Sequence, residues 1–283
     1  MDAAALGPGR DRDRHMPPTR IPYGDLPENV RSEVEQCTGE VHHAESAGSG
    51  LNSSVAAVLV AVGGKFFVKA LPSDHRWVWT QAAEAAVAPF VRAIAPRLLA
   101  RIVTDGWDVL VFEAITGHQA DYTPESGDLR AVADLLTRLG EIPCPDVTLR
   151  EAPLRLQRYA APDELHHFAG PCLLHTDLNN ANVIVADGRA CMVDWGWATR
   201  GAAWLDAAYW TIWLISAGHS PVEAERWAQR IPAWQTATDA GLAAFAAANA
   251  RMWHQIAGAQ PDAWTRRMVV AAERWNVYRA SRI

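Results

Sequence analysis

Strand-like patterns are concentrated in the first 115 residues, and this uneven distribution limits what the chain can fold into. The segments are short, apolar or alternating, and separated by turns: 41–47, 55–62, 66–71, the region near Ile102, and 108–112. A helical pattern over 73–94 interrupts them. Because neighbouring strands joined by short turns pair antiparallel, we expect a five-stranded antiparallel sheet with one main helix.

After Gly117 the pattern changes to helical spacing, as over 129–139, and strand signals return only over 172–194. From Trp204 onward nearly every segment is helical in pattern. Ten of the 13 tryptophans lie at or after Trp195, which predicts aromatic packing between these helices. The chain is therefore expected to be an α+β protein with a small sheet-rich part and a larger, mostly helical part.

The same patterns predict three regions along the chain. Residues 1–24, rich in glycine, proline and alternating charge, are expected to form a flexible tail. Residues 25–117 are expected to form the small lobe and the segment that connects the lobes. Residues 118–283 are expected to form the larger helical lobe.

Composition narrows the possible partners and location. The formal net charge of −6 does not favour a nucleic-acid partner, which would select a basic face. The longest apolar run, around 207–217, is too short to span a membrane. Four cysteines are scattered without metal-ligand or disulfide spacing, so we expect a reduced, cytoplasmic protein. We expect it to act as a monomer or a weak homodimer.

Three oxygen-bearing side chains follow short apolar segments at a suggestive spacing. Asp177 and Asn182 come after the apolar run 172–174, and Asp194 follows a hairpin pattern over 183–193 whose turn is Asp187-Gly188. The hairpin has the right length to return Asp194 beside Asn182. Carboxylate and amide oxygens suit magnesium, with phosphate oxygens completing the shell. The alternative is an ordinary turn aspartate and a plain surface hairpin.

The strand 66–68 ends at Lys69, one of only two lysines in the chain. A charge after an apolar strand needs a partner or a ligand, and an ammonium there can neutralise nucleotide phosphates. The alternative is a lysine that protects an edge strand from aggregation. Glu84, within the helical pattern, is a candidate to pair with Lys69; otherwise it is an ordinary solvated glutamate.

The small-residue loop at 48–54 is a candidate phosphate cradle, because glycine lets backbone N–H groups approach a ligand closely. It matches neither the dinucleotide nor the Walker glycine motif, so a generic hairpin loop is an equal interpretation. The candidate nucleotide-contacting residues of this loop are Ser49, Gly50, Asn52 and Ser53.

Together these residues resemble the aminoglycoside phosphotransferase family, the small-molecule branch of the protein-kinase-like fold. The run His175-x-Asp177-x4-Asn182 is similar to the family's catalytic loop, with His175 bracing the loop and Asp177 orienting the acceptor hydroxyl. Asp194 resembles its second magnesium ligand, and Asp206 a structural aspartate of the helical lobe. The family often has glycine where Thr176 stands and His-Pro where Asn179-Asn180 stand.

The resemblance also implies a cofactor site and an activity. The segment 112–117 would be the hinge, where the backbone of Glu113 and Ile115 meets the adenine of ATP or GTP. The expected reaction is Mg²⁺-dependent phosphorylation of a hydroxyl on a small molecule, most simply a cationic antibiotic, and thus resistance. Open alternatives are a metabolic kinase for choline, homoserine or a sugar, and a nucleotide-binding pseudokinase.

Protein kinases fit less well. They place a lysine two residues after the catalytic aspartate, where this chain has Asn179. They also need a long activation segment, and here only about ten residues separate Gly196 from the helical pattern that holds Asp206.

Overall fold

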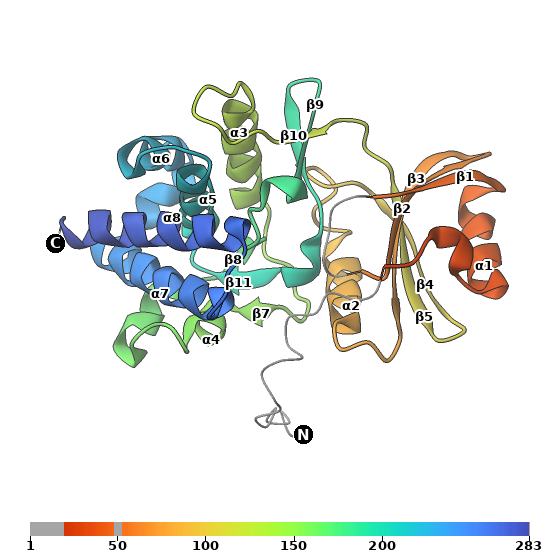
Figure 1. The fold of residues 1–283 in the computed structure, drawn as a ribbon, viewed down its shortest axis with the longest axis horizontal. Coiled ribbons are helices and arrows are strands. Elements are labelled where there is room, and N and C mark those ends of the chain that lie inside the picture. Colours follow the sequence, from red (N-terminus) through yellow and green to blue (C-terminus); the bar gives the residue numbers. More distant parts are fainter. Residues whose placement is uncertain (1–19, 48–52, 283) are drawn as a thin grey trace. The chain divides into compact units, whose positions relative to one another are not determined.

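The computed structural model describes residues 20–47 and 53–282 of the chain (Figure 1). Within them the chain forms two compact units. The first comprises the described residues up to Val78 together with Ala100–Val111. The second comprises Trp79–Leu99 and the residues from Phe112 onward. The functional division into lobes at residue 117 stays a prediction.

A five-stranded sheet with the order β1-β2-β3-β5-β4 is the main feature of the N-terminal region. The strands are β1 (Val41–Ser46), β2 (Val55–Ala61), β3 (Gly64–Pro72), β4 (Leu98–Thr104) and β5 (Trp107–Glu113). β2 pairs antiparallel with β3 from Val55↔Ala70 to Ala61↔Gly64, so the predicted tight turn is confirmed. The expected five-stranded antiparallel sheet is present.

The first unit begins earlier than the sequence suggested. Residues 20–24, expected to belong to the tail, are part of the fold: the Ile21 N–H donates to Ser54 O at 2.8 Å. Tyr23 in the short 3-10 turn Tyr23–Asp25 is only 5% exposed. Burial of the aromatic ring contributes more free energy than ordering these residues costs in entropy. Helix α1 (Glu28–Thr38) begins shortly after this turn.

The main helix is shorter than expected. A helix over 73–94 was predicted, but α2 covers only Val78–Val87. Pro89 explains the early end, because its ring has no N–H to donate and clashes with the preceding helical turn. The segment from Ala88 to Ile94 continues as turns, and the Met192 N–H donates to Ile94 O at 2.7 Å.

The second unit is mostly helical, as predicted. Its further helices are α3 (Asp128–Gly140), α4 (Ala152–Leu156), α5 (Leu205–Ser216), α6 (Pro221–Ala228), α7 (Asp239–Ala257) and α8 (Ala263–Ala280). α7 and α8 lie side by side (Figure 1). A capping box begins α6, with the Glu223 N–H donating to Ser220 Oγ at 3.2 Å. No helix within the described residues combines the length and apolar character needed to cross a bilayer.

Two small three-stranded sheets carry the segments around the site. One has the order β10-β9-β6 and the other β7-β11-β8. Their strands are β6 (His118–Gln119), β7 (Arg150–Glu151), β8 (Cys172–Leu174), β9 (Val183–Ala186), β10 (Arg189–Met192) and β11 (Thr199–Gly201). Strands β6, β7 and β11 were not predicted, because two or three residues are too short to show a period of two.

The aromatic packing predicted for the C-terminal helices is present. Phe245 on α7 is fully buried and lies edge-on to Trp204, Tyr209 and Trp275, with ring centroids 5.6, 4.8 and 6.0 Å away. Such T-shaped pairs are favoured by the ring quadrupole. They join α5, α7 and α8 into one core, which fixes the N-terminal end of α5.

Candidate active site

The loop after β8 is held by one buried carboxylate. Asp206, in the first turn of α5 and 4% exposed, accepts the His175 N–H through Oδ2 and the Thr176 N–H through Oδ1, both at 2.8 Å. Burial raises the pKa of Asp206 above its ordinary value, while these hydrogen bonds act in the opposite direction. A residue remote in sequence therefore fixes the path of the loop by two bonds.

Thr176 occupies the left-handed region of backbone conformation, with φ of 66°. This conformation is sterically strained for a β-branched residue, so contacts with neighbouring residues must stabilise it. Its Oγ1 donates to Trp197 O at 3.1 Å and accepts from Arg155 Nη1. A glycine would adopt this conformation without the strain. The supporting role of Arg155 was missed, and no motif in the sequence indicates it.

The ring of His175 is enclosed and its hydrogen bonds define one tautomer. Nδ1 accepts the Asp177 N–H at 3.3 Å, and Nε2 faces Val193 O at 3.0 Å, so Nε2 carries the proton. The residue is fully buried and packs edge-on against Trp195, with centroids 4.7 Å apart. His175 thus links the loop of Asp177 to the strand end that precedes Asp194.

Asp177 is half-buried at the tip of this loop. Oδ1 faces the Asn179 N–H at 3.4 Å, and the Asp177 carbonyl accepts from Asn182 Nδ2 at 3.3 Å. Burial raises the pKa of the Asp177 carboxyl, and the negative charge of Asp194 raises it further. The two carboxylates are therefore close enough for each to influence the ionisation of the other.

The hairpin of β9 and β10 brings Asp194 to Asn182, as its length predicted. Met192 pairs with Val183, and the Val193 N–H donates to Asn182 O at 2.9 Å. At the turn, Asp187 and Gly188 both have positive φ, 50° and 71°, as this type of two-residue hairpin requires. Asp194 follows with φ of 65°, so this non-glycine residue also lies in the left-handed region.

Glu84 lies on α2 and is 3% exposed, so the interpretation as a solvated helical glutamate is wrong. Its Oε1 accepts the Trp195 N–H at 3.3 Å, a contact that connects the residue after Asp194 to α2. Gly196 lies against the same helix, where a Cβ would come within 2.9 Å of Thr80 Cβ. The pairing of Glu84 with Lys69 stays a prediction.

Lys69 belongs to the other compact unit and is 8% exposed. Its strand β3 lies between β2 and β5, so the interpretation as an edge-strand lysine is wrong. Lys65, in contrast, is exposed. Of the predicted phosphate loop, Ser53 is half-buried, whereas Ser49, Gly50 and Asn52 lie outside the described residues.

The predicted hinge residues follow β5. Glu113 ends this strand, and its exposed carboxylate pairs with Arg97 Nη2 at 2.7 Å. Ile115 is half-buried in the irregular segment that follows. The contact of their backbone with adenine stays a prediction.

The donor set around Asp194 fits a hard divalent cation. The described residues contain no cluster of three or more His, Cys, Asp or Glu side chains suited to a metal. Magnesium needs fewer protein ligands, because waters and phosphates complete its octahedron. Asn182 uses its amide nitrogen on Asp177 O, which leaves Oδ1 for a cation. The negative charge of Asp194 also raises the pKa of Asp177, and a bound cation would offset this repulsion.

Sequence comparison finds neither a matching family model nor a matching curated protein. Solved structures do match. Choline kinase LicA from Streptococcus pneumoniae is 14% identical, with a TM-score of 0.63 over 88% of this chain and 98% of that chain. Aminoglycoside phosphotransferase APH(4)-Ia is 13% identical, with a TM-score of 0.58 over 87% and 98%.

A third structure is the aminoglycoside phosphotransferase from Alicyclobacillus acidocaldarius subsp. acidocaldarius, with 12% identity and a TM-score of 0.58 over 88% of this chain and 93% of that chain. LicA has been solved in complex with AMP, and an APH(4)-Ia mutant with AMP-PNP and hygromycin B. At this level of identity the likeness concerns the fold. The chain has the protein-kinase-like fold that LicA and the aminoglycoside phosphotransferases share.

Proposed function

We propose that this protein is a member of the aminoglycoside phosphotransferase family that transfers the terminal phosphoryl group of ATP, or of GTP, to a hydroxyl of a small molecule. The supporting observation is that Asn182 donates to Asp177 O and accepts the N–H of Val193, the residue before Asp194, so the segments that carry these three residues are bonded to one another. Phosphoryl transfer asks a protein mainly for positioning and charge neutralisation, and this set of oxygens provides both.

Each residue has a distinct proposed role. Asp177 accepts a hydrogen bond from the acceptor hydroxyl and orients its oxygen for attack. Asn182 and Asp194 hold magnesium, which when bound neutralises the phosphate oxygens. Lys69, with the loop of Ser53, binds the nucleotide phosphates, and the backbone at Glu113 and Ile115 binds the adenine. His175 keeps the loop in place through its two ring nitrogens.

An antibiotic is the proposed acceptor, and the support comes from the similarity in fold to APH(4)-Ia, which has been solved with hygromycin B. A metabolic kinase is the second candidate, because LicA, a choline kinase, has the higher TM-score of 0.63. The two candidates share the proposed catalytic residues and differ only in the acceptor.

The test is incubation of the protein with MgATP and a panel of hydroxyl compounds that includes hygromycin B, other aminoglycosides, choline, homoserine and sugars. We expect one added phosphoryl group by mass spectrometry. Asp177→Ala is the matched control: it should lose transfer by a factor of about 10³ or more and still bind ATP, measured by calorimetry. Nucleotide binding without transfer to any acceptor would favour a pseudokinase instead.

A further inference from the structure

A cavity of about 260 Å³ lies beside α6 in the second unit. Its lining comes from α6, from the turn after α5 and from the segment between β6 and α3: Pro124, His219, Glu223, Arg226, Trp227 and Arg230. The volume is just below the range of about 300–1,000 Å³ that drug-sized ligands occupy, so it suits a small molecule. Asp206, which holds the catalytic loop, is in the first turn of α5, whereas this cavity lies beyond the last turn of that helix.

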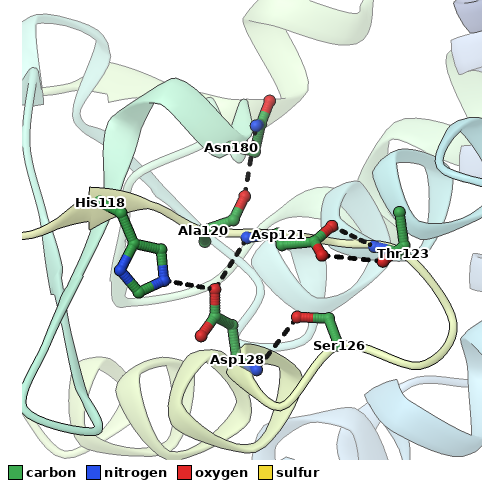
Figure 2. Close-up of polar contacts among 7 residues, drawn as sticks. All are labelled: His118, Ala120, Asp121, Thr123, Ser126, Asp128 and Asn180. Carbon is green, nitrogen blue, oxygen red and sulfur yellow. Dashed lines mark hydrogen bonds and ion pairs between the residues drawn. The ribbon is translucent and has the colours of Figure 1, made fainter.

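The side of the cavity that carries Pro124 is held in one conformation by short-range hydrogen bonds. The Asp121 carboxylate accepts the N–H and the hydroxyl of Thr123, both at 2.9 Å, as Figure 2 shows. The Ser126 N–H donates to Thr123 O at 3.0 Å, which closes a turn around Pro124. Ser126 Oγ in turn accepts the Asp128 N–H at 3.1 Å (Figure 2). This side is therefore in place before any ligand binds.

The two aromatic residues of the lining are also fixed. His219 is 1% exposed, its Nε2 donates to Tyr122 O at 3.0 Å, and its N–H donates to Leu214 O at 3.1 Å. Trp227 is half-buried and lies edge-on to Trp210 of α5, with ring centroids 6.4 Å apart. The cavity is thus bounded by residues that are anchored to the core.

Two arginines on the same side of α6 supply positive charge. Residues 223, 226, 227 and 230 recur at helical spacing, so their side chains share one face of α6 and its C-terminal turn. Within residues 20–47 and 53–282, no group forms a hydrogen bond or an ion pair with the guanidinium of Arg226 or of Arg230. The guanidinium carbon of Arg230 lies 4.2 Å from the ring centroid of Trp227, and this cation–π contact orients it.

Glu223, the one acidic residue of the lining, is committed to the start of the helix. Its Oε2 accepts the Ser220 N–H at 2.9 Å and the Ser220 hydroxyl at 2.7 Å. These hydrogen bonds lower the pKa of Glu223, so it stays ionised in its capping role. Arg226 and Arg230 are one helical turn apart and repel each other. The lining therefore carries two cations against one anion, and an anionic ligand would relieve the repulsion.

We propose that this cavity binds the phosphate group of a small phosphorylated molecule through Arg226 and Arg230. One guanidinium fork is enough for the two oxygens of a carboxylate, whereas two guanidinium groups suit a phosphate, with its three acceptor oxygens and higher charge. Trp227 and Pro124 offer apolar surface to the carbon skeleton of the ligand. The site is separate from the residues assigned to phosphoryl transfer and does not depend on that function.

The test is calorimetric titration of the full-length protein, without ATP, with glycerol 3-phosphate and with D-glycerate. Both probes have three carbons and two hydroxyl groups, but D-glycerate carries a carboxylate. Wild type should bind glycerol 3-phosphate with a Kd of about 1 mM or tighter. D-Glycerate should bind about tenfold more weakly, because it offers fewer oxygens and less charge. The double variant Arg226→Gln/Arg230→Gln should bind glycerol 3-phosphate at least about tenfold more weakly than wild type.

Arg267→Gln/Arg274→Gln is the matched control. Both residues are exposed on α8, so this variant also removes two positive charges from the surface. It should keep the wild-type Kd for glycerol 3-phosphate. The ligand-free Arg226→Gln/Arg230→Gln variant should keep a melting temperature close to that of wild type, since neither guanidinium is hydrogen-bonded within the described chain.

Three results would overturn the proposal. Absence of binding to wild type at millimolar glycerol 3-phosphate would show that the cavity is not a phosphate site. Equal weakening in both double variants would mean a general effect of net charge. Binding that persists in Arg226→Gln/Arg230→Gln would place the phosphate elsewhere in the protein. Because the titration involves no ATP and no transfer, each of these results leaves the proposed phosphotransferase function standing.

Discussion

At the scale of residues, the site depends on backbone conformations that the local sequence does not favour. Thr176 and Asp194 both have positive φ, and neither is glycine. Each such residue costs of order 1–3 kcal/mol and persists only where the surroundings over-determine it. Asp206 and Arg155 hold Thr176 in this conformation through hydrogen bonds to its N–H and its hydroxyl. Glu84 accepts the Trp195 N–H and so fixes the backbone directly after Asp194.

Replacing Asp206 by alanine should destabilise the protein. The variant leaves the N–H groups of His175 and Thr176 buried without an acceptor, at a cost of roughly 2–4 kcal/mol in the free energy of unfolding. Urea denaturation measures this. Asp146→Ala, at an exposed aspartate, should change stability by about 0.5 kcal/mol or less. Equal stability of both variants would show that the two bonds do not hold the loop.

The activity should show an acid limb set by Asp177. The proposed role requires an ionised carboxylate, and burial raises the pKa of Asp177 above its ordinary value of 3.8. As the pH falls through this raised pKa, Asp177 is protonated and kcat/KM should fall about tenfold per pH unit. Carbon-13 NMR of the carboxyl in the ligand-free protein gives the pKa directly. A value at or below 3.8 would contradict the expected effect of burial.

At the scale of elements, hairpin geometry and close backbone approach place the functional side chains. The β9–β10 hairpin returns the chain so that Val193 bonds to Asn182. On its other side β9 is approached by Gly117, where a Cβ would come within 2.5 Å of Val185 O and 2.9 Å of Ile184 Cγ2. The glycine therefore allows the chain before β6 to approach β9, the strand that leads out of the catalytic loop, closely enough for the two strands to pair.

Gly117→Ala should force β6 away from β9. A contact of this kind with backbone cannot be relieved by a rotamer change, so we expect a loss of about 1–3 kcal/mol in unfolding free energy and reduced transfer activity. Gly140→Ala is the control, because it lies at the end of α3 with open space at its Cβ. It should be neutral or slightly stabilising. Thermal unfolding and turnover of both variants check this, and similar results for the two would argue against steric crowding.

At the scale of the whole molecule, the C-terminal helices are joined by buried charge as well as by aromatic packing. Arg279 on α8 lies 2.6 Å from Glu225 Oε1 of α6 and donates through Nη1 to Asp239 of α7 at 3.0 Å. Trp275 Nε1 also donates to Glu225 at 2.7 Å. The guanidinium of Arg279 thus joins three helices, and the core that supports α5 depends on their assembly.

Arg279→Met should destabilise the protein by about 3 kcal/mol, because Glu225 is left buried without its cation. Arg274→Met, at an exposed position of the same helix, is the matched control and should change stability little. Both are measured by denaturant unfolding. If Arg279→Met retained wild-type stability, the attraction between Arg279 and Glu225 would be fully offset by the cost of removing their charges from water.

Much of the architecture could be read from the sequence, because periodicity and turn residues act locally. The strands of the first sheet and the turn at Asp187-Gly188 are local patterns, and they were predicted. The helix predicted over 73–94 is shorter in the structure because Pro89 cannot donate a helical hydrogen bond. Strands β6, β7 and β11 exist only through pairing with distant segments, so their sequences carry no signal.

By itself the sequence determined which side chains offer oxygen to a cation, and that Asp194 returns beside Asn182, because a hairpin of fixed length closes on itself. Only the tertiary structure decided that Asp206 accepts hydrogen bonds from two backbone N–H groups of the loop, and that Glu84 is buried and bonded to the Trp195 N–H. These contacts join residues 30 to 111 positions apart. Burial and electrostatic effects depend on distances in space, and the local sequence patterns do not indicate which distant residues come into contact.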